Sequence, residues 1–428
     1  MPGHKGHGAL GVEAFDITEI DGADVLYSPS GIIAESEKNA TDLFGTAHSF
    51  YSTEGSTLAI KAMLKLVSED TSRGERATVL AGRNAHKAFI YAAALLDLDI
   101  EWLFGDEGSH ICECHITPEM LDGVLSKIKK RPCAIYITSP DYLGNIADVK
   151  GLSLVADRYG IPLLVDNAHG AYLKLLSPSR HPIDLGASMC ADSAHKTLPV
   201  LTGGAYLHIA KKAEGFIPRA RSAMSLFAST SPSYLILQSL DLANAVVSDG
   251  YRDRLSLAVG AASSVKKELS DLGFSVGDTE PLKIVIHAPD YGYTGEQIAN
   301  ILRRDRIECE FSGRDYIVFM LTPENMDGER GDCRRLVEAL SKIPPRAPLT
   351  HALPKIPICE RRFTAREAIL ARSETVPSEN AVGRALASPT VACPPAVPVA
   401  TSGEVLTEEA VSALSYYGID TVEVVKEA

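Results

Sequence analysis

Residues 166–196 contain a carboxylate and an amine whose types and spacing could hold two ends of one cofactor. Asp166 directly follows the apolar run 161–165, which has the composition of a buried strand. A carboxylate in that place could pair with a protonated pyridine nitrogen and strengthen the ring as an electron sink. Taken alone, Asp166 is equally well explained as a structural residue of a strand-to-loop turn.

Lys196 follows Ser193-Ala-His195, and these small and polar neighbours are unusual around an exposed lysine. Burial would lower the pKa of the amine, and the neutral amine can then form a Schiff base with a carbonyl group. A surface lysine at a helix start explains the residue equally well by itself. Together, an acid after a buried strand and a lysine behind Ser-x-His are what a pyridoxal-phosphate site needs.

The phosphate of such a cofactor needs hydrogen-bond donors, and two segments could provide them. Gly55-Ser56-Thr57 opens a predicted helix, where hydroxyls, free backbone amides and the helix dipole would converge on an anion. In isolation the same turn is a good helix cap. Ser193 lies close enough to Lys196 in sequence to be a second donor. His86 begins another predicted helix and could either stack on the ring or cap the helix.

A β-sheet must position these residues, and the pattern of the sequence predicts such a sheet. Apolar runs that read as strands alternate with stretches of helical spacing. The predicted strands are 77–80, 100–104, 134–138 and 161–165, and the predicted helices are 58–67, 86–96, 118–130 and 149–159. This order, with nearly all-apolar strands, predicts an α/β fold with a mostly parallel sheet covered on both faces. Ligands of such sheets bind at the carboxyl ends of the strands, where the polar turns fall.

Five segments of the chain differ in pattern. An irregular arm is expected at 1–40, a large cofactor-binding domain at 41–275, a small α/β domain at 276–342, a Pro-rich linker at 343–357 and a C-terminal domain at 358–428. The large domain should close with one long helix over 232–272. Strands at 274–276, 282–287 and 317–321 would build the small domain. The last segment should contain a helix at 364–372, a Pro-rich stretch at 389–398 and a final helix and strand.

Composition excludes several classes of function. The net charge of −13, from 42 basic and 55 acidic residues, disfavours binding to nucleic acid or an anionic membrane. The most apolar stretch, 89–104, contains Asp97, Asp99 and Glu101 and cannot span a bilayer. The first residues do not read as a signal peptide, and the eight cysteines do not read as a disulfide framework, so a cytoplasmic protein is expected.

One segment has the composition of a metal site. Residues 110–115 contain two histidines and two cysteines, which are ligands for soft metals. Their alternation with Ile111 and Ile116 fits equally a strand that leads into a helix near Thr117. Because no second ligand cluster follows at metal spacing, no metal is expected.

Nearly from end to end, the chain resembles the fold-type-I pyridoxal-phosphate decarboxylases of the ornithine/lysine/arginine group. The motifs that carry the resemblance are residues 2–5 (PGHK), 16–19 (DITE), 55–57 (GST), 83–87 (RNAHK), 138–144 (TSPDYLG), 166–170 (DNAHG), 193–198 (SAHKTL) and 230–234 (TSPSY). The resemblance implies a seven-stranded, aspartate-aminotransferase-like large domain, a small α/β domain and a C-terminal α+β domain. It also implies pyridoxal 5'-phosphate as the cofactor.

The resemblance further implies residue roles. Lys196 would bind the cofactor covalently, Asp166 its pyridine nitrogen and His86 its ring face, with Ala168 packed beneath. Ser56, Thr57, Ser193 and Ser229 would hold the phosphate beside His195, with Ser229 acting on the neighbouring subunit. Lys196 or His169 would return a proton to the substrate carbanion.

The expected activity is decarboxylation of arginine, lysine or ornithine in polyamine biosynthesis, by a homodimer or larger homo-oligomer. Some motifs depart from the family: Asn167 stands where Glu is common, 202–205 replaces TQxA, and 393–398 and 401–404 are altered forms of YPPGIP and PGE.

Two alternatives to this function remain. One is another reaction on the same fold, such as an aminotransferase or lyase, with Arg303, Arg304, Arg306 or Arg314 available for a substrate carboxylate. The other is a non-catalytic partner protein.

Overall fold

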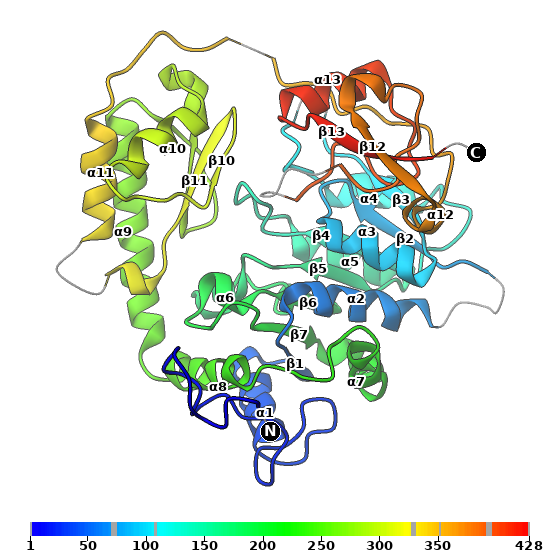
Figure 1. The fold of residues 1–428 in the computed structure, drawn as a ribbon, viewed down its shortest axis with the longest axis vertical. Coiled ribbons are helices and arrows are strands. Elements are labelled where there is room, and N and C mark those ends of the chain that lie inside the picture. Colours follow the sequence, from blue (N-terminus) through cyan, green and yellow to red (C-terminus); the bar gives the residue numbers. More distant parts are fainter. Residues whose placement is uncertain are drawn as a thin grey trace. The chain divides into compact units, whose positions relative to one another are not determined.

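The computed structural model describes residues 2–69, 75–106, 109–326, 331–350, 352–390 and 396–426. The chain divides into two compact units, whose helices and strands are labelled in Figure 1. Unit 1 comprises Met1–Phe104, Ile116–Ser139 and Ala147–Gly250, and unit 2 comprises Gly105–His115, Pro140–Ile146 and Tyr251–Ala428. The domain boundaries given above stay predictions.

Unit 1 is built on a seven-stranded sheet of order β1-β7-β6-β5-β4-β2-β3. Its strands are β1 (His48–Ser52), β2 (Thr78–Gly82), β3 (Asp99–Leu103), β4 (Ala134–Thr138), β5 (Leu163–Asp166), β6 (Met189–Asp192) and β7 (Ala205–Ile209). Only β7 runs against its neighbours, so the predicted mostly parallel sheet is confirmed. Every residue of β2, β5, β6 and β7 is buried, as expected for a sheet covered on both faces.

The helices of unit 1 connect these strands. They are α1 (Ile32–Phe44), α2 (Gly55–Ser68), α3 (Lys87–Leu96), α4 (Pro118–Leu125), α5 (Val149–Tyr159), α6 (Ala194–Thr197), α7 (Ile217–Ser225) and α8 (Tyr234–Ser248), with 3-10 turns η1 (Ala171–Leu175) and η2 (Lys211–Phe216). Two local predictions were wrong. Residues 32–40, expected to be irregular, form most of α1, and α4 ends at Leu125 instead of continuing to residue 130.

The single long helix predicted over 232–272 is two helices. α8 ends at Ser248, and α9 (Tyr251–Asp271) begins after Gly250, whose φ is +70°. Residues with a side chain rarely adopt that conformation, whereas glycine does so at little cost. The helical spacing continues through this point in the sequence, which is why periodicity alone did not indicate the break.

Unit 2 contains two smaller sheets. The first has the order β10-β11-β9-β8, and its strands are β8 (Ser275–Val276), β9 (Lys283–His287), β10 (Phe311–Ser312) and β11 (Tyr316–Met320), all paired antiparallel. The second pairs β12 (Ser373–Pro377) with β13 (Thr421–Val425). The helices are α9, α10 (Gly295–Arg303), α11 (Asp332–Ser341), α12 (Ala365–Leu370) and α13 (Glu408–Tyr416), with 3-10 turns η3 (Ala288–Tyr291), η4 (Pro323–Met326) and η5 (Ser378–Asn380).

Other predictions for unit 2 had mixed outcomes. The final helix and strand are confirmed as α13 and β13. The strand considered for residues 111–116 is wrong, because that segment consists of turns and irregular backbone. The described part of 343–357 is likewise irregular. Residues 391–395, which include the first three residues of the altered 393–398 motif, lie outside the described residues. In the described part of the chain, no helix is long and apolar enough to cross a bilayer.

Candidate active site

Asp166 and Lys196 lie at the same edge of the large sheet. Asp166 is the last residue of β5, and the neighbouring parallel strand β6 ends at Asp192. Ser193 and the one-turn helix α6, which contains Lys196, follow directly. The carboxyl ends of adjacent parallel strands therefore bring the two predicted residues to one place.

Lys196 is half-buried, and its Nζ lies 3.0 Å from Nε2 of the buried His169. Its charge also acts on two other predicted residues: it opposes the rise that burial causes in the pKa of Asp166, and it adds to the fall that burial causes in the pKa of His86. The structure thus brings together the four side chains that the sequence assigned to the cofactor ring and the proton transfer: Asp166, His86, His169 and Lys196.

Asp166 is a buried carboxylate with two hydrogen-bond donors. The Tyr136 hydroxyl donates to Oδ2 at 3.0 Å, and the Ala168 backbone N–H donates to Oδ1 at 3.3 Å. Burial raises the pKa of Asp166 above its usual value, although Lys196 and the two donors act in the opposite direction. A cation beside this carboxylate would therefore be strongly favoured. Tyr136 was not predicted, because its only signal in the sequence was a phenol hydroxyl within a predicted buried strand.

The proposed phosphate donors gather where α2 begins. α2 starts at Gly55, as predicted, and the Ser193 hydroxyl donates to Ser56 Oγ at 2.9 Å. Thr57 is exposed in the first turn. Ser229 is also exposed, and its backbone N–H donates to Glu54 Oε1 of its own chain at 2.7 Å. Two hydroxyls and a helix start therefore converge on one point.

The two remaining predicted histidines, His86 and His195, have defined orientations. His86 precedes α3, as predicted, and its Nδ1 accepts a hydrogen bond from the Ala88 N–H at 3.1 Å. Burial, followed by the charges of Lys196 and Lys87, lowers the pKa of His86 to about 4. The ring is therefore neutral at pH 7, as both capping and stacking on a ring require. The half-buried His195 donates from Nδ1 to the carbonyl oxygen of Gly204 at 3.0 Å.

These residues fit pyridoxal phosphate. A half-buried lysine, a buried carboxylate that favours a cation and a hydroxyl pair at a helix N-terminus correspond to the aldehyde, the pyridine nitrogen and the phosphate. Thr138 Oγ1 is also buried at this edge and has no hydrogen-bond partner among the described residues. An unsatisfied buried hydroxyl at a strand end is consistent with a place for a bound group.

The structure does not assemble a metal site from residues 110–115. Within the described ranges, the only His, Cys, Asp or Glu group with suitable spacing is His181, Cys190 and Asp192, whose ligand atoms lie within 4.8 Å of one another. All three are fully buried, and Cys190 and Asp192 belong to β6.

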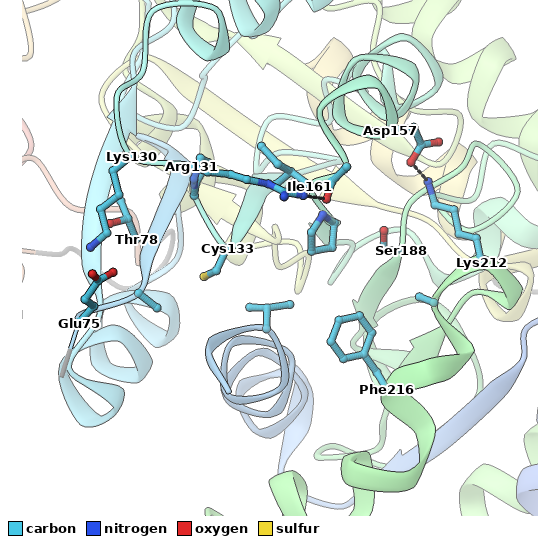
Figure 2. Close-up of a pocket in the computed structure, with 16 residues that line it drawn as sticks. Glu75, Thr78, Lys130, Arg131, Cys133, Asp157, Ile161, Ser188, Lys212 and Phe216 are labelled. Atoms are coloured by element: carbon cyan, nitrogen blue, oxygen red, sulfur yellow. Dashed lines mark hydrogen bonds and ion pairs between the residues drawn. The ribbon is translucent and has the colours of Figure 1, made fainter. Parts of the chain in front are cut away.

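A cavity of about 690 Å³ lies at the opposite edge of the sheet (Figure 2). Residues at or just before the starts of β2, β4, β5 and β6 line it, together with three basic side chains. Each basic side chain has an oxygen partner: Lys130 the Arg76 carbonyl, Arg131 the Gly160 carbonyl and Lys212 the Asp157 carboxylate. The residues assigned to the cofactor all lie elsewhere, so this cavity is not part of the candidate site.

Comparison with known proteins identifies related sequences and folds. Residues 10–285 match the sequence profile described as Orn/Lys/Arg decarboxylase, major domain. The chain is 31% identical over 418 residues to the uncharacterized protein YaaO of Bacillus subtilis, covering 94% of this chain and 85% of that protein. It is 28% identical to arginine decarboxylase of the same organism, covering 96% and 88%. Its fold is similar to that of the lysine decarboxylase LdcF of Francisella novicida, with TM-score 0.80, 18% identity and coverage of 99% and 78%.

Proposed function

Because the chain belongs to the ornithine/lysine/arginine decarboxylase family of pyridoxal-phosphate enzymes, we propose that it removes the α-carboxyl group of a basic amino acid. The observation that carries the proposal is the cluster at the carboxyl ends of β5 and β6. There Lys196 Nζ lies 3.0 Å from His169 Nε2, and the charge of Lys196 opposes the rise that burial causes in the pKa of Asp166. The fold is that of the fold-type-I enzymes.

We propose that each part of the cofactor has its own contacts. Lys196 would hold it covalently, Asp166 would pair with its pyridine nitrogen and the neutral His86 would cover its ring, with Ala168 beneath. Ser56, Thr57 and Ser193 would hold the phosphate at the start of α2, beside His195. Ser229 would act on the phosphate of a second subunit, in a homodimer or larger homo-oligomer.

When bound, pyridoxal phosphate supplies an electron sink for the carbanion left by carbon dioxide. The protein's part is to hold the Asp166 carboxyl group opposite the pyridine nitrogen and to return one proton to the substrate carbon. His169 Nε2 and Lys196 Nζ are the two candidates for that transfer, and they are within hydrogen-bond distance of each other at 3.0 Å. A proton on either atom can therefore pass to the other.

The substrate class is tested by supplying arginine, lysine and ornithine separately and measuring released carbon dioxide. We expect release from at least one of them and no release from a neutral amino acid such as leucine. The net charge of −13 supports a cationic substrate. Transfer of the amino group to a keto acid without carbon dioxide release would instead identify an aminotransferase.

The aminotransferase alternative needs an arginine for the substrate carboxylate. Arg303, Arg304, Arg306 and Arg314 are all exposed on unit 2, and Arg303 already bonds Glu308 and Asn300. The non-catalytic alternative predicts no visible cofactor absorption that borohydride can bleach. We also propose that this decarboxylase acts in polyamine biosynthesis in the cytoplasm.

Removal of a phosphate donor should weaken cofactor binding more than it slows turnover of the loaded enzyme. Ser56→Ala removes the hydroxyl that accepts from Ser193 at the start of α2. A hydrogen bond to a charged group contributes ~1.5–3 kcal/mol, so we expect the Kd for pyridoxal phosphate to rise roughly 10- to 100-fold. Titration of the apoenzyme with pyridoxal phosphate, followed by visible absorption, measures this Kd. The matched control is Ser126→Ala, because the exposed Ser126 hydroxyl donates to the Gly123 carbonyl of its own helix.

A further inference from the structure

Asp192 is a fully buried carboxylate whose oxygens are contacted by three side chains from separate parts of the chain. Asn167 Nδ2 donates to its Oδ1 at 2.7 Å, and His181 Nε2 lies 2.9 Å from its Oδ2. His208 Nε2 lies 3.3 Å from the same Oδ2. All four side chains have an exposed fraction of 0%. No role in the reaction proposed above accounts for this network.

The network joins the two turns that carry the candidate site. Asn167 stands between Asp166 and the segment with Ala168 and His169, and its backbone N–H bonds the Ala191 carbonyl at 2.9 Å. Asp192 directly precedes Ser193 and α6. The bond from Asn167 to Asp192 therefore connects the turn after β5 to the turn after β6. On its far side, His208 Nδ1 lies 2.8 Å from the Ser49 hydroxyl, which extends the network to β1.

The charge of Asp192 decides which residue can stand at position 167. Burial by itself would raise the pKa of Asp192, but the two adjacent imidazoles outweigh it and hold that pKa below its usual value. The carboxylate is thus ionised and needs donors, and the Asn167 amide is one. An acidic residue at position 167 would place a second carboxylate against the first in a fully buried site, which is unfavourable unless one of them is protonated.

The same geometry explains why the group of His181, Cys190 and Asp192 is not assigned to a metal. The Asp192 oxygens already accept from an amide and face imidazole nitrogens, which satisfies a buried carboxylate without an ion. Cys190 has a pKa well above its usual value because of burial and the nearby Asp192, so its thiol is protonated. Metal binding would require removal of that proton at a fully buried position.

We infer that Asn167 and Asp192 are a matched pair of positioning residues. The hydrogen bond between this amide and this carboxylate fixes the turn after β5 relative to the turn after β6. The pair acts through Asp166 and His169 on one turn and through Ser193 and Lys196 on the other. The effect of this pair on turnover rests on the proposed function. The effect of the pair on cofactor binding requires only that the site holds pyridoxal phosphate.

The test introduces a carboxyl group of the same size as the amide at position 167. A second variant then also replaces the Asp192 carboxyl group that faces it. In Asn167→Asp, the new carboxyl group can donate to Asp192 while it is protonated, as the amide does. Its pKa in the folded protein is raised above the unfolded value, so its favourable contribution is present at low pH and lost as pH rises through the folded-state pKa. We expect the affinity of full-length Asn167→Asp for pyridoxal phosphate to fall at least roughly tenfold between pH 5.5 and pH 8.5, relative to the unmodified chain.

The double variant Asn167→Asp/Asp192→Asn restores one carboxylate and one amide, and it should lose this additional pH dependence. Asn167→Ala, which adds no titratable group, should weaken binding by a similar factor at every pH. Thermal unfolding of each variant without cofactor separates loss of folding from loss of positioning. The inference is overturned if Asn167→Asp shows the pH profile of the unmodified chain, or if the double variant keeps the profile of the single one.

These outcomes are distinguishable from failure of the proposed function. If the unmodified chain binds pyridoxal phosphate but releases carbon dioxide from none of the basic amino acids, the proposed activity fails. The binding measurements on the Asn167 and Asp192 variants then still support or overturn the pairing. Where activity is present, the kcat of Asn167→Asp should follow the same pH profile with little change in KM, because the altered groups do not contact substrate.

Discussion

Replacement of Lys196 by alanine is expected to abolish the visible absorption of the bound cofactor and reduce decarboxylation on the order of 10³-fold or more. Lys196 is the amine at the carboxyl edge of β6, and its Nζ already faces His169 at 3.0 Å. Without it, the cofactor has no covalent attachment to the protein, and His169 loses its partner for proton transfer. Absorption spectra before and after borohydride, together with a carbon dioxide assay, measure both effects.

The control is Lys38→Ala on α1, because the Lys38 side chain is 73% exposed and pairs with Asp42, one turn away on the same helix. This variant should keep the absorption and the activity of the unmodified chain. Absorption that persists in Lys196→Ala and still bleaches with borohydride would show that another lysine holds the cofactor. Mass spectrometry of the reduced protein would then identify that lysine.

Loss of Asp166 should separate cofactor retention from turnover. In Asp166→Ala, Lys196 and the hydroxyls at the start of α2 remain, so some cofactor should still bind. Turnover should fall roughly 10²-fold or more, because no buried carboxylate remains to stabilise positive charge on the pyridine nitrogen. Stopped-flow spectra and kcat at saturating cofactor measure the two quantities in the same preparation.

Asp166→Asn sharpens this prediction, since it keeps the size of the side chain and removes only its charge. It should lose nearly as much turnover as the alanine variant. Asp157→Ala, in which the exposed partner of Lys212 is removed at the opposite sheet edge, is the control. Unimpaired kcat in Asp166→Asn would refute the assignment of this carboxylate to the pyridine nitrogen.

The parts of the fold that the sequence predicted were those where local pattern and tertiary environment agree. The strand Ala134–Thr138 and the helix Val149–Tyr159 have the predicted bounds, because an apolar run and a helical stripe each end at clear polar signals. The break at Gly250 was missed because the helical pattern continues across it. Helix α1 was missed because its many polar residues weaken the apolar stripe, although Ile33, Ala40 and Phe44 are buried.

The candidate site was predictable to the extent that its residues stand at turns after strands. Asp166, Ser193 and Lys196 lie at or just after the ends of two adjacent parallel strands, and the sheet brings these ends together. Tyr136 and Asp192 were not identified, because their importance comes from which side chains face them across the sheet. Asn167 was the one available signal, because it stands where Glu is common in the family, but the sequence does not indicate which residue faces it.

The contact between Asn167 and Asp192 has a consequence for how sequences of this family can diverge. Two amides at these positions can still bond each other, whereas two carboxylates at neutral pH repel. A lineage could therefore exchange the acid from one turn to the other through an intermediate with Asn at both positions, but not through one with an acid at both. Positions 167 and 192, which are 25 residues apart in the chain, should consequently be inherited as a unit, with one acid shared between them.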